Sequence, residues 1–171
     1  DSEHVALLLN DWCAGAGSTQ GLRVVVLNVA SGAPELVGEV ALSGHLMDSR
    51  LVGSALYVAS RAYVATVDPN EPDAPEVWEW TMRLSSVDLS APASAEVVDT
   101  VSFVGNDSVA YATSSLFFMA NREWLREGRF WSRRTTIEVV DISDPSGALA
   151  PQSTLRLNGV VADKFKMNLH G

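Results

Sequence analysis

Apolar and polar residues alternate with a period of two along most of this chain, in short runs that end at glycine, proline or aspartate. A period of two predicts β-strands that bury one face. The pattern occurs in copies that read VVVLNVASGAPELVGEVALSG from residue 24, LSSVDLSAPASAEVVDTVSFVG from residue 84 and IEVVDISDPSGALAPQSTLRLNG from residue 137. Similarity at a nearly regular spacing indicates a repeat architecture built from β-strands.

The copies align at a polar residue that ends one run and at a glycine that closes the next. The aligned residues are Asn28, Asp88 and Asp141, followed by Gly44, Gly105 and Gly159. Turns rich in Ser, Pro and Gly lie between them, and these residue types favour tight backbone conformations. The aspartates are therefore expected to cap the turns that follow them.

Each unit contains four predicted strands. A short run follows the closing glycine at residues 47–52, 109–113 and 160–167, and a second apolar run lies at residues 55–59 and 116–120. A variable insertion, an alternating strand, a turn and a final strand complete the unit. A four-stranded antiparallel sheet of this length cannot cover both of its own faces, so the units must stack. Radial stacking of such sheets predicts an all-β fold of the β-propeller type.

The predicted blades of a single domain (1–171) are residues 1–44, 45–105 and 106–159, with the first strand of a further blade at residues 160–171. The chain opens in a second-strand run at residues 4–9 and closes in a first-strand run, so its ends are complementary parts of a blade. About three blades are fewer than the roughly four to eight of a closed propeller. We expect a partial propeller whose remaining blades lie in a separate chain, a cleaved partner or a C-terminal portion. Closure between copies is the less favoured alternative.

Composition narrows the function classes. The 171 residues are 47% hydrophobic and carry a net charge of −9, which argues against nucleic acid as a partner, since its binders present a basic surface. The single cysteine, Cys13, excludes an internal disulfide and a CxxC site. No run reaches the ~18 apolar residues of a membrane-spanning helix. No signal peptide is visible at Asp1, so any leader or lipid anchor would lie outside this chain.

Three segments carry a family resemblance: DSRLVGSALYVAS at residues 48–60, VVDISDP at residues 139–145 and, most specifically, GVVADKFKM at residues 159–167. With them, nearly all of the chain resembles bacterial and archaeal secreted proteins with a C-terminal β-propeller domain. The resemblance implies a longer propeller, exported to the cell surface or periplasm and often made as a lipoprotein, with no catalytic residues to carry over. In that family a VLRVVT-like strand follows DKFKM, whereas here Leu169, His170 and Gly171 follow, which predicts truncation or cleavage.

The loops predicted between second and third strands, at residues 11–20, 63–81 and 121–134, hold every tryptophan of the chain. These are Trp12, Trp78, Trp80, Trp124 and Trp131. One hypothesis is that each indole fills the gap between adjacent blades and donates its N–H to a backbone carbonyl. The other hypothesis is an exposed aromatic platform for a saccharide, a peptide or a partner subunit, because tryptophan is enriched at interface hot spots.

Two of these loops differ in charge. One holds the acidic residues Asp68, Glu71, Asp73, Glu76 and Glu79. In the other, Arg122, Arg126, Arg129, Arg133 and Arg134 outnumber Glu123 and Glu127. The loops either neutralise each other or serve separate partners, and exposed pairs of this kind add only ~0–1 kcal/mol to stability. The arginine-rich loop is the best single candidate for a docking surface.

The loops between the fourth strand and the next first strand are expected to surround the central channel. Their candidate binding residues are Asp48, Arg50, Asp163 and Lys164. Val109 stands at the position of the two aspartates in the middle blade, and no calcium-loop motif occurs, so no metal is predicted. Hydrogen bonding to strand ends is the expected role of the aspartates. A pair of carboxylates for glycoside hydrolysis across the channel is the alternative.

The sequence contains no GxSxG, HExxH or P-loop motif, and its three histidines are far apart. These observations disfavour an enzyme and indicate no cofactor. The predicted function is a non-catalytic, extracytoplasmic binding or scaffold module that engages a protein partner through the Trp- and Arg-bearing loops. A carbohydrate-binding or glycoside-cleaving propeller that uses the same face is the alternative.

Overall fold

The computed structural model describes residues 3–11, 21–66, 77–106, 108–127, 129–164 and 167. These residues form three antiparallel sheets and one short 3-10 turn, η1 (Pro92–Ser94). Sheet 1 contains β1 (His4–Asp11), β2 (Gly21–Asn28) and β3 (Glu35–Ser43). Sheet 2 contains β4 (His45–Val52), β5 (Ala55–Thr66), β6 (Val77–Asp88) and β7 (Glu96–Val104). Sheet 3 contains β8 (Ser108–Ala112), β9 (Leu116–Glu127), β10 (Phe130–Asp141) and β11 (Ala150–Asn158).

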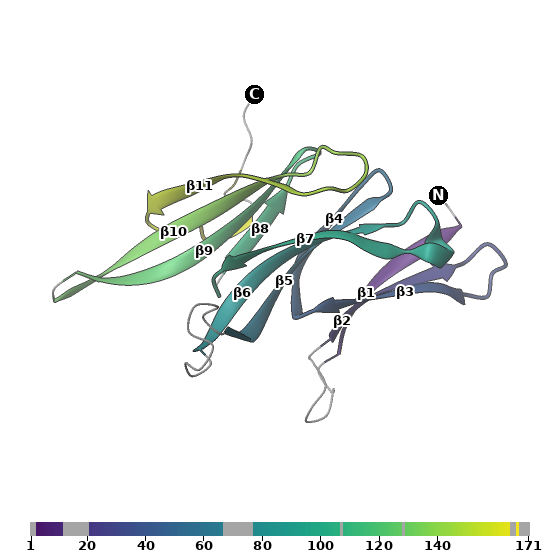
Figure 1. The fold of residues 1–171 in the computed structure, drawn as a ribbon, viewed down its shortest axis with the longest axis horizontal. Coiled ribbons are helices and arrows are strands. Elements are labelled where there is room, and N and C mark those ends of the chain that lie inside the picture. Colours follow the sequence, from purple (N-terminus) through teal and green to yellow (C-terminus); the bar gives the residue numbers. More distant parts are fainter. Residues whose placement is uncertain are drawn as a thin grey trace.

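Within each sheet, every strand pairs with its neighbour in sequence, so the sheets are simple up-and-down meanders (Figure 1). Each predicted unit contains one of these sheets, and sheet 1 begins at the strand that corresponds to the second strand of the other two. The all-β prediction and the strand order within a unit are confirmed. The described residues show no closed ring of sheets.

The turns confirm the register of the repeat. The side-chain oxygen Oδ1 of Asn28, Asp88 or Asp141 accepts a hydrogen bond from the backbone N–H two residues later, at 2.9, 2.8 and 2.8 Å. In each sheet this residue ends the strand that corresponds to β6, and the bond starts the turn to the next strand. The predicted capping role of the two aspartates is therefore confirmed.

The sheets pack face to face in the order of the sequence. We call the face that points to the next sheet the forward face, and the opposite one the back face. Leu22 and Val24 on the forward face of sheet 1 contact Leu56 and Val58 on the back face of sheet 2. In the same way, the forward face of sheet 2, with Leu84, packs on the back face of sheet 3. The same stacking geometry is thus used twice.

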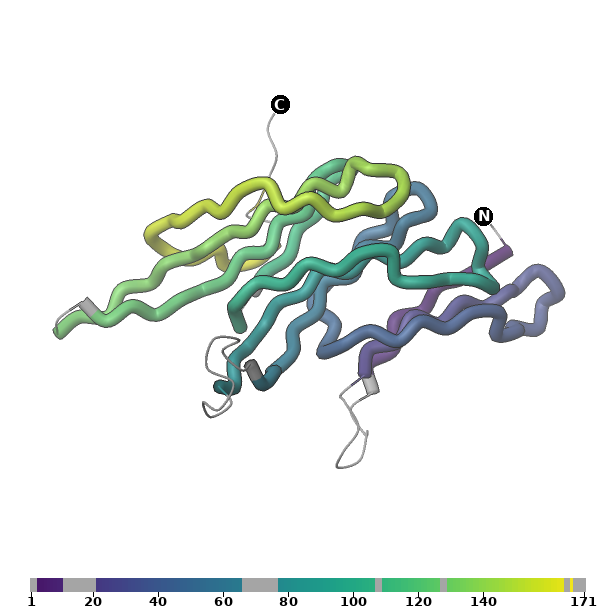
Figure 2. Tube along the Cα trace, in the orientation of Figure 1, coloured from purple at the N-terminus to yellow at the C-terminus, as the bar shows by residue number. Residues whose placement is uncertain are grey.

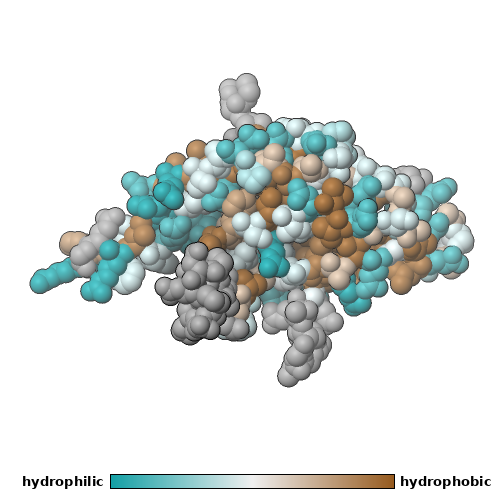
Figure 3. Space-filling view, in the orientation of Figure 1, coloured by the Kyte–Doolittle hydropathy of each residue, from teal (hydrophilic) through white to brown (hydrophobic). Residues whose placement is uncertain are grey.

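The two outermost faces stay apolar without a sheet to cover them among the described residues. On the back face of sheet 1, Val5, Leu7 and Leu9 are 40–41% exposed. On the forward face of sheet 3, Leu155 and Leu157 are each 47% exposed. Figure 3 shows brown hydrophobic atoms at the surface of the region that sheets 1 and 2 occupy in Figure 1.

The insertions predicted as loops at residues 63–81 and 121–134 contain strand at residues 63–66, 77–81, 121–127 and 130–134. Strand β5 continues to Thr66 and β6 starts at Val77, while β9 continues to Glu127 and β10 starts at Phe130. The period of two persists there, but charged and aromatic residues replace the apolar ones, so hydrophobicity alone ended the predicted strands too early. Figure 2 shows the β9–β10 hairpin as an arm that projects beyond the other strands.

The first-strand prediction at residues 160–167 is wrong for its described part. Residues 160–164 follow Gly159 as irregular chain rather than as a strand. Val161 and Met167 nevertheless pack against Ala120, Ile137 and Val139 on the forward face of sheet 3. Alternating residues form a strand only when another strand supplies backbone partners, and no pairing of this segment is found in the described part of the chain.

Candidate functional site

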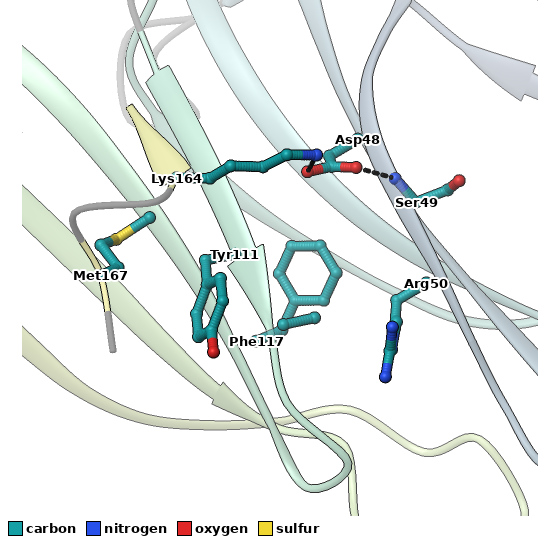
Figure 4. A pocket seen from close by; sticks show the side chains of 8 residues that line it. Asp48, Ser49, Arg50, Tyr111, Phe117, Lys164 and Met167 are labelled. Atoms are coloured by element: carbon teal, nitrogen blue, oxygen red, sulfur yellow. Dashed lines mark hydrogen bonds and ion pairs between the residues drawn. The ribbon is translucent and has the colours of Figure 1, made fainter. Parts of the chain in front are cut away.

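Strand β4 of sheet 2, strands β8 and β9 of sheet 3 and the segment after β11 bring three of the predicted channel residues together: Asp48, Arg50 and Lys164 (Figure 4). Asp48 stands at an irregularity in the pairing of β4 with β5. Its Oδ2 accepts a hydrogen bond from the Lys164 ammonium at 3.1 Å, and its Oδ1 accepts one from the Ser49 backbone N–H at 2.9 Å. This ion pair joins strand β4 to the segment that follows sheet 3.

A cavity of about 260 Å³ lies beside this ion pair. Its lining includes Arg50 from β4, Tyr111 from β8, Phe117 from β9 and Met167. Half of the lining residues are thus aromatic or apolar. The wall also contains the Arg50 guanidinium and the Asp48 carboxylate, which is paired with Lys164. Because Lys164 holds Asp48, the carboxylate needed for the glycoside-hydrolysis alternative is already paired. Asp163, which precedes Lys164 in the sequence, is partly buried but does not line this cavity.

No metal site is found at these positions. Among the described residues there is no group of three or more His, Cys, Asp or Glu side chains that could hold a metal ion. A search of the same residues for a helix long and apolar enough to cross a membrane also found none.

The arm of sheet 3, defined as residues 121–127 and 129–134, carries the arginine-rich candidates. The strand register pairs Trp124 with Arg133 and Arg126 with Trp131, and all four belong to the forward face. The guanidinium carbon of Arg133 lies 4.2 Å from the ring centroid of Trp124, which is a cation–π contact. Trp124 and Trp131 are 60% and 63% exposed.

The corresponding hairpin of sheet 2 carries a similar set of side chains. Tyr63 lies 5.2 Å from Trp80 and 5.5 Å from Trp78, measured between ring centroids. The guanidinium carbon of Arg61 lies 5.7 Å from the Trp80 ring centroid. The register places all four on the forward face of sheet 2. Each hairpin therefore ends in a ladder of aromatic rings and arginine.

The hypothesis that tryptophans fill gaps between blades is wrong for Trp78, which is exposed although sheet 3 stacks on the same face. Trp78, Trp124 and Trp131 are each more than half exposed. Trp80 is partly buried, but against Tyr63 and Arg61 of its own sheet. Trp12 and the predicted acidic residues Asp68, Glu71, Asp73 and Glu76 lie outside the described residues.

The five arginines of the predicted docking loop do not share one face. Arg133 belongs to the forward face, whereas Arg134, its neighbour on β10, points to the opposite side. Arg134 lines a groove of about 600 Å³ between sheets 2 and 3, together with Arg156, Glu123 and Glu138. Arg129 lies exposed at the tip of the hairpin. A substitution of Arg133 together with Arg134 would therefore change two separate surfaces.

The electrostatics of the turns follow from their hydrogen bonds. The Ser90 backbone N–H and hydroxyl, both bonded to Asp88, lower the pKa of that carboxyl. Hydrogen bonds from Ser143 likewise lower the pKa of Asp141. Burial, with a smaller effect from nearby Asp144 and Asp141, raises the pKa of the Tyr57 hydroxyl. These shifts arise at turns and in the core between sheets 2 and 3.

Sequence reasoning missed Tyr63, Arg61 and Tyr111. The first two could have been found from the alternation of Arg61 with Tyr63, opposite the alternation of Trp78 with Trp80. Tyr111 carries no such signal, because its place beside the Asp48–Lys164 pair depends on how the sheets pack. Comparison of the chain with family models, curated proteins and solved structures finds no significant match.

Proposed function

We propose that this chain is part of a β-propeller that works as a non-catalytic binding scaffold outside the cytoplasm. The observation that carries the proposal is the repeated stacking of a forward face on a back face, with one apolar face uncovered at each end of the described stack. A further four-stranded sheet of the same repeat is the occupant that matches each uncovered face.

The inner strands support a radial arrangement. Strands β4 and β8, the first strands of sheets 2 and 3, contact each other, and Lys164 reaches Asp48 on β4 from the segment after sheet 3. First strands that converge in this way are typical of the centre of a propeller. Coverage of the exposed leucines and valines would also remove apolar surface from water, at about 25 cal/mol per Å².

The location outside the cytoplasm rests on the resemblance of the DKFKM segment to secreted propeller proteins. The binding role rests on the exposed ladders of the two hairpins, which carry aromatic rings and arginine, the residue types that dominate protein interfaces. A non-catalytic role agrees with the pairing of Asp48 by Lys164.

The experiment is native mass spectrometry of the protein purified from its source, followed by intact-mass analysis after denaturation. The expected result is a complex heavier than one chain, or a longer chain that contains further repeats. A monodisperse single chain of 171 residues would overturn the partial-propeller proposal.

A pair of variants makes this test specific for the uncovered face. Leu155→Asp with Leu157→Asp places two charges on the forward face of sheet 3 and is expected to abolish the assembly. Ala93→Asp with Ser94→Asp adds the same two charges at the exposed η1 turn and is expected to leave it intact. Equal behaviour of both variants would contradict the proposal.

A further inference from the structure

The two aromatic ladders occupy equivalent positions of the repeat. The two hairpins can be aligned at Asp88 and Asp141, which pair with Ala55 and Leu116 on the preceding strands. This alignment makes Tyr63 equivalent to Trp124. By the same alignment Trp78 corresponds to Trp131, Trp80 to Arg133 and Arg61 to Arg122. Each ladder contains one arginine over one tryptophan ring. In sheet 2 the arginine lies on β5 and the tryptophan on β6, whereas in sheet 3 the arginine lies on β10 and the tryptophan on β9.

Sheet 2 shows what happens to such a ladder when a neighbouring sheet is in place. Sheet 3 covers Leu84 on the forward face of sheet 2 completely, yet Tyr63 and Trp78 farther along the same face stay 52% and 53% exposed. A further sheet stacked on sheet 3 in the same way would therefore leave Trp124 and Trp131 accessible. The forward face of the arm would therefore stay exposed to solvent in a complete ring of sheets.

The charge of the arm is opposite to that of the molecule. It contains five arginines and two glutamates, a net charge of +3, so the rest of the chain carries −12 when the total is −9. The equivalent hairpin sequence, residues 63–81, carries five acidic residues and no basic one. The arm projects from the body (Figure 2), and at physiological salt charges more than about 8 Å apart are largely screened from each other.

The stacked arginine is arranged to receive a carboxylate. The Trp124 ring covers one face of the Arg133 guanidinium, and within the described residues that guanidinium makes no hydrogen bond or ion pair. Stacking orients a guanidinium while its N–H groups stay free at the edge, where a carboxylate can accept two parallel hydrogen bonds. On Trp124, Arg133 occupies a ring face on which a neutral sugar would otherwise stack.

The shape of the arm favours an extended polypeptide. Strand β8 pairs with β9 only up to Asn121, and β11 pairs with β10 only from Arg134 onward. Beyond these pairs no further strand is assigned beside the arm in the described part of the chain, so the arm projects as a two-stranded ribbon. A strand added to the edge of such a ribbon gains backbone hydrogen bonds and presents alternate side chains to the same face.

We propose that the forward face of the arm binds an acidic polypeptide segment, with carboxylates at Arg133 and apolar side chains against Trp124 and Trp131. This inference deepens the proposed binding role and rests on it. The partner is defined by its chemistry: an extended segment in which acidic and apolar or aromatic residues alternate.

The test measures fluorescence anisotropy with a fluorescein-labelled synthetic peptide of alternating glutamate and tyrosine, and with a lysine–tyrosine peptide as the control probe. Arg133→Gln is expected to weaken binding of the acidic peptide about tenfold, the size of one charge-assisted interaction. Arg133→Lys keeps the charge but loses the planar stack and is expected to fall between. Arg23→Gln, which removes the same charge from the exposed Arg23–Glu39 pair of sheet 1, is the matched control.

An equal loss in Arg23→Gln and Arg133→Gln would mean that net charge alone attracts the peptide, and would overturn the inference. The inference would also be overturned if the acidic peptide did not bind, or if an oligouronate saccharide bound and the peptide did not. The Leu155→Asp, Leu157→Asp variant separates the two proposals, since it is expected to lose assembly but still bind the peptide. Thermal unfolding of each variant verifies that the fold is kept.

Discussion

The forward faces of sheets 2 and 3 are equivalent surfaces of one repeat, but their environments differ. On sheet 2, Tyr57 and Leu84 are 1% and 0% exposed because sheet 3 lies on them. On sheet 3, Ile137 is covered by Val161 and Met167, while Leu155 on the neighbouring strand is 47% exposed. The ladder beyond each face is exposed in both sheets.

The difference shows that the body of the face and the ladder have separate roles. The body is apolar in both sheets, as a stacking surface must be, whether or not a sheet covers it. The ladder stays accessible even where stacking is complete, so its aromatic rings and arginines are not used for stacking. Substitutions at equivalent positions of the two sheets can therefore separate stacking from binding.

The largest expected effect comes from two leucines on the equivalent faces. Leu84→Ala leaves a cavity under sheet 3 and is expected to lower the free energy of unfolding by about 2–5 kcal/mol. In the 171-residue chain separated from any further sheet, Leu155→Ala is expected to cost less than about 1 kcal/mol, since its side chain is then half in water. Urea unfolding of both variants checks this. A loss at Leu155 as large as that at Leu84 would show that the outer face is covered in solution.

The next effect compares two glycines that follow the last strand of a sheet, Gly44 after β3 and Gly159 after β11. Gly44 has a φ of +87°, and a Cβ there would overlap the carbonyl oxygen of Arg61. Gly159 has a φ of +110°, and none of the described atoms lies within 4 Å of such a Cβ. Gly159→Ala should cost about 1–2 kcal/mol for the left-handed backbone, and Gly44→Ala should cost more. Thermal unfolding of the two variants gives the order, and equal costs would contradict it.

A smaller effect is expected at Tyr57, whose equivalent in sheet 3 is Phe118. The Tyr57 hydroxyl donates a buried hydrogen bond to the carbonyl oxygen of Ile142 at 3.1 Å and so joins sheet 2 to the turn after β10. Tyr57→Phe leaves that carbonyl without this donor and should cost about 1 kcal/mol. Phe118→Tyr on the uncovered face is the reciprocal variant. A stability gain in Tyr57→Phe would show that the hydrogen bond is not formed in solution.

The smallest effect concerns pH. Hydrogen bonds from Ser90 and Ser143 lower the pKa of Asp88 and Asp141 in the folded state, so both carboxylates stabilise the fold above their unfolded pKa. This contribution is lost as the pH falls through the lowered folded pKa, below about pH 4. Asn28 forms the same turn without a charge, so Asp88→Asn should keep the turn and reduce the acid dependence. The free energy of unfolding of both proteins, measured at pH 7 and at pH 3, checks this. An equal loss of stability between the two pH values in the variant and the unsubstituted protein would contradict it.

The sequence predicts the periodic part of this structure well. Alternation, turn chemistry and the aligned Asn28, Asp88 and Asp141 are local properties, because each depends on residues that are close along the chain. The loop predictions at residues 63–81 and 121–134 failed where the pattern continued with arginine and tryptophan in place of valine and leucine. Exposed two-stranded ribbons need no apolar side chain at alternate positions.

The sequence by itself determined the strands, the turns and the repeat, since backbone hydrogen bonding and a period of two are local. Tertiary structure alone decided which face each sheet covers and that Lys164 reaches Asp48. It also decided that the ladder stays exposed beside a stacked sheet. The reason is physical: burial and ion pairing depend on how far apart residues lie in space after the sheets have packed, and the spacing along the chain does not contain that distance.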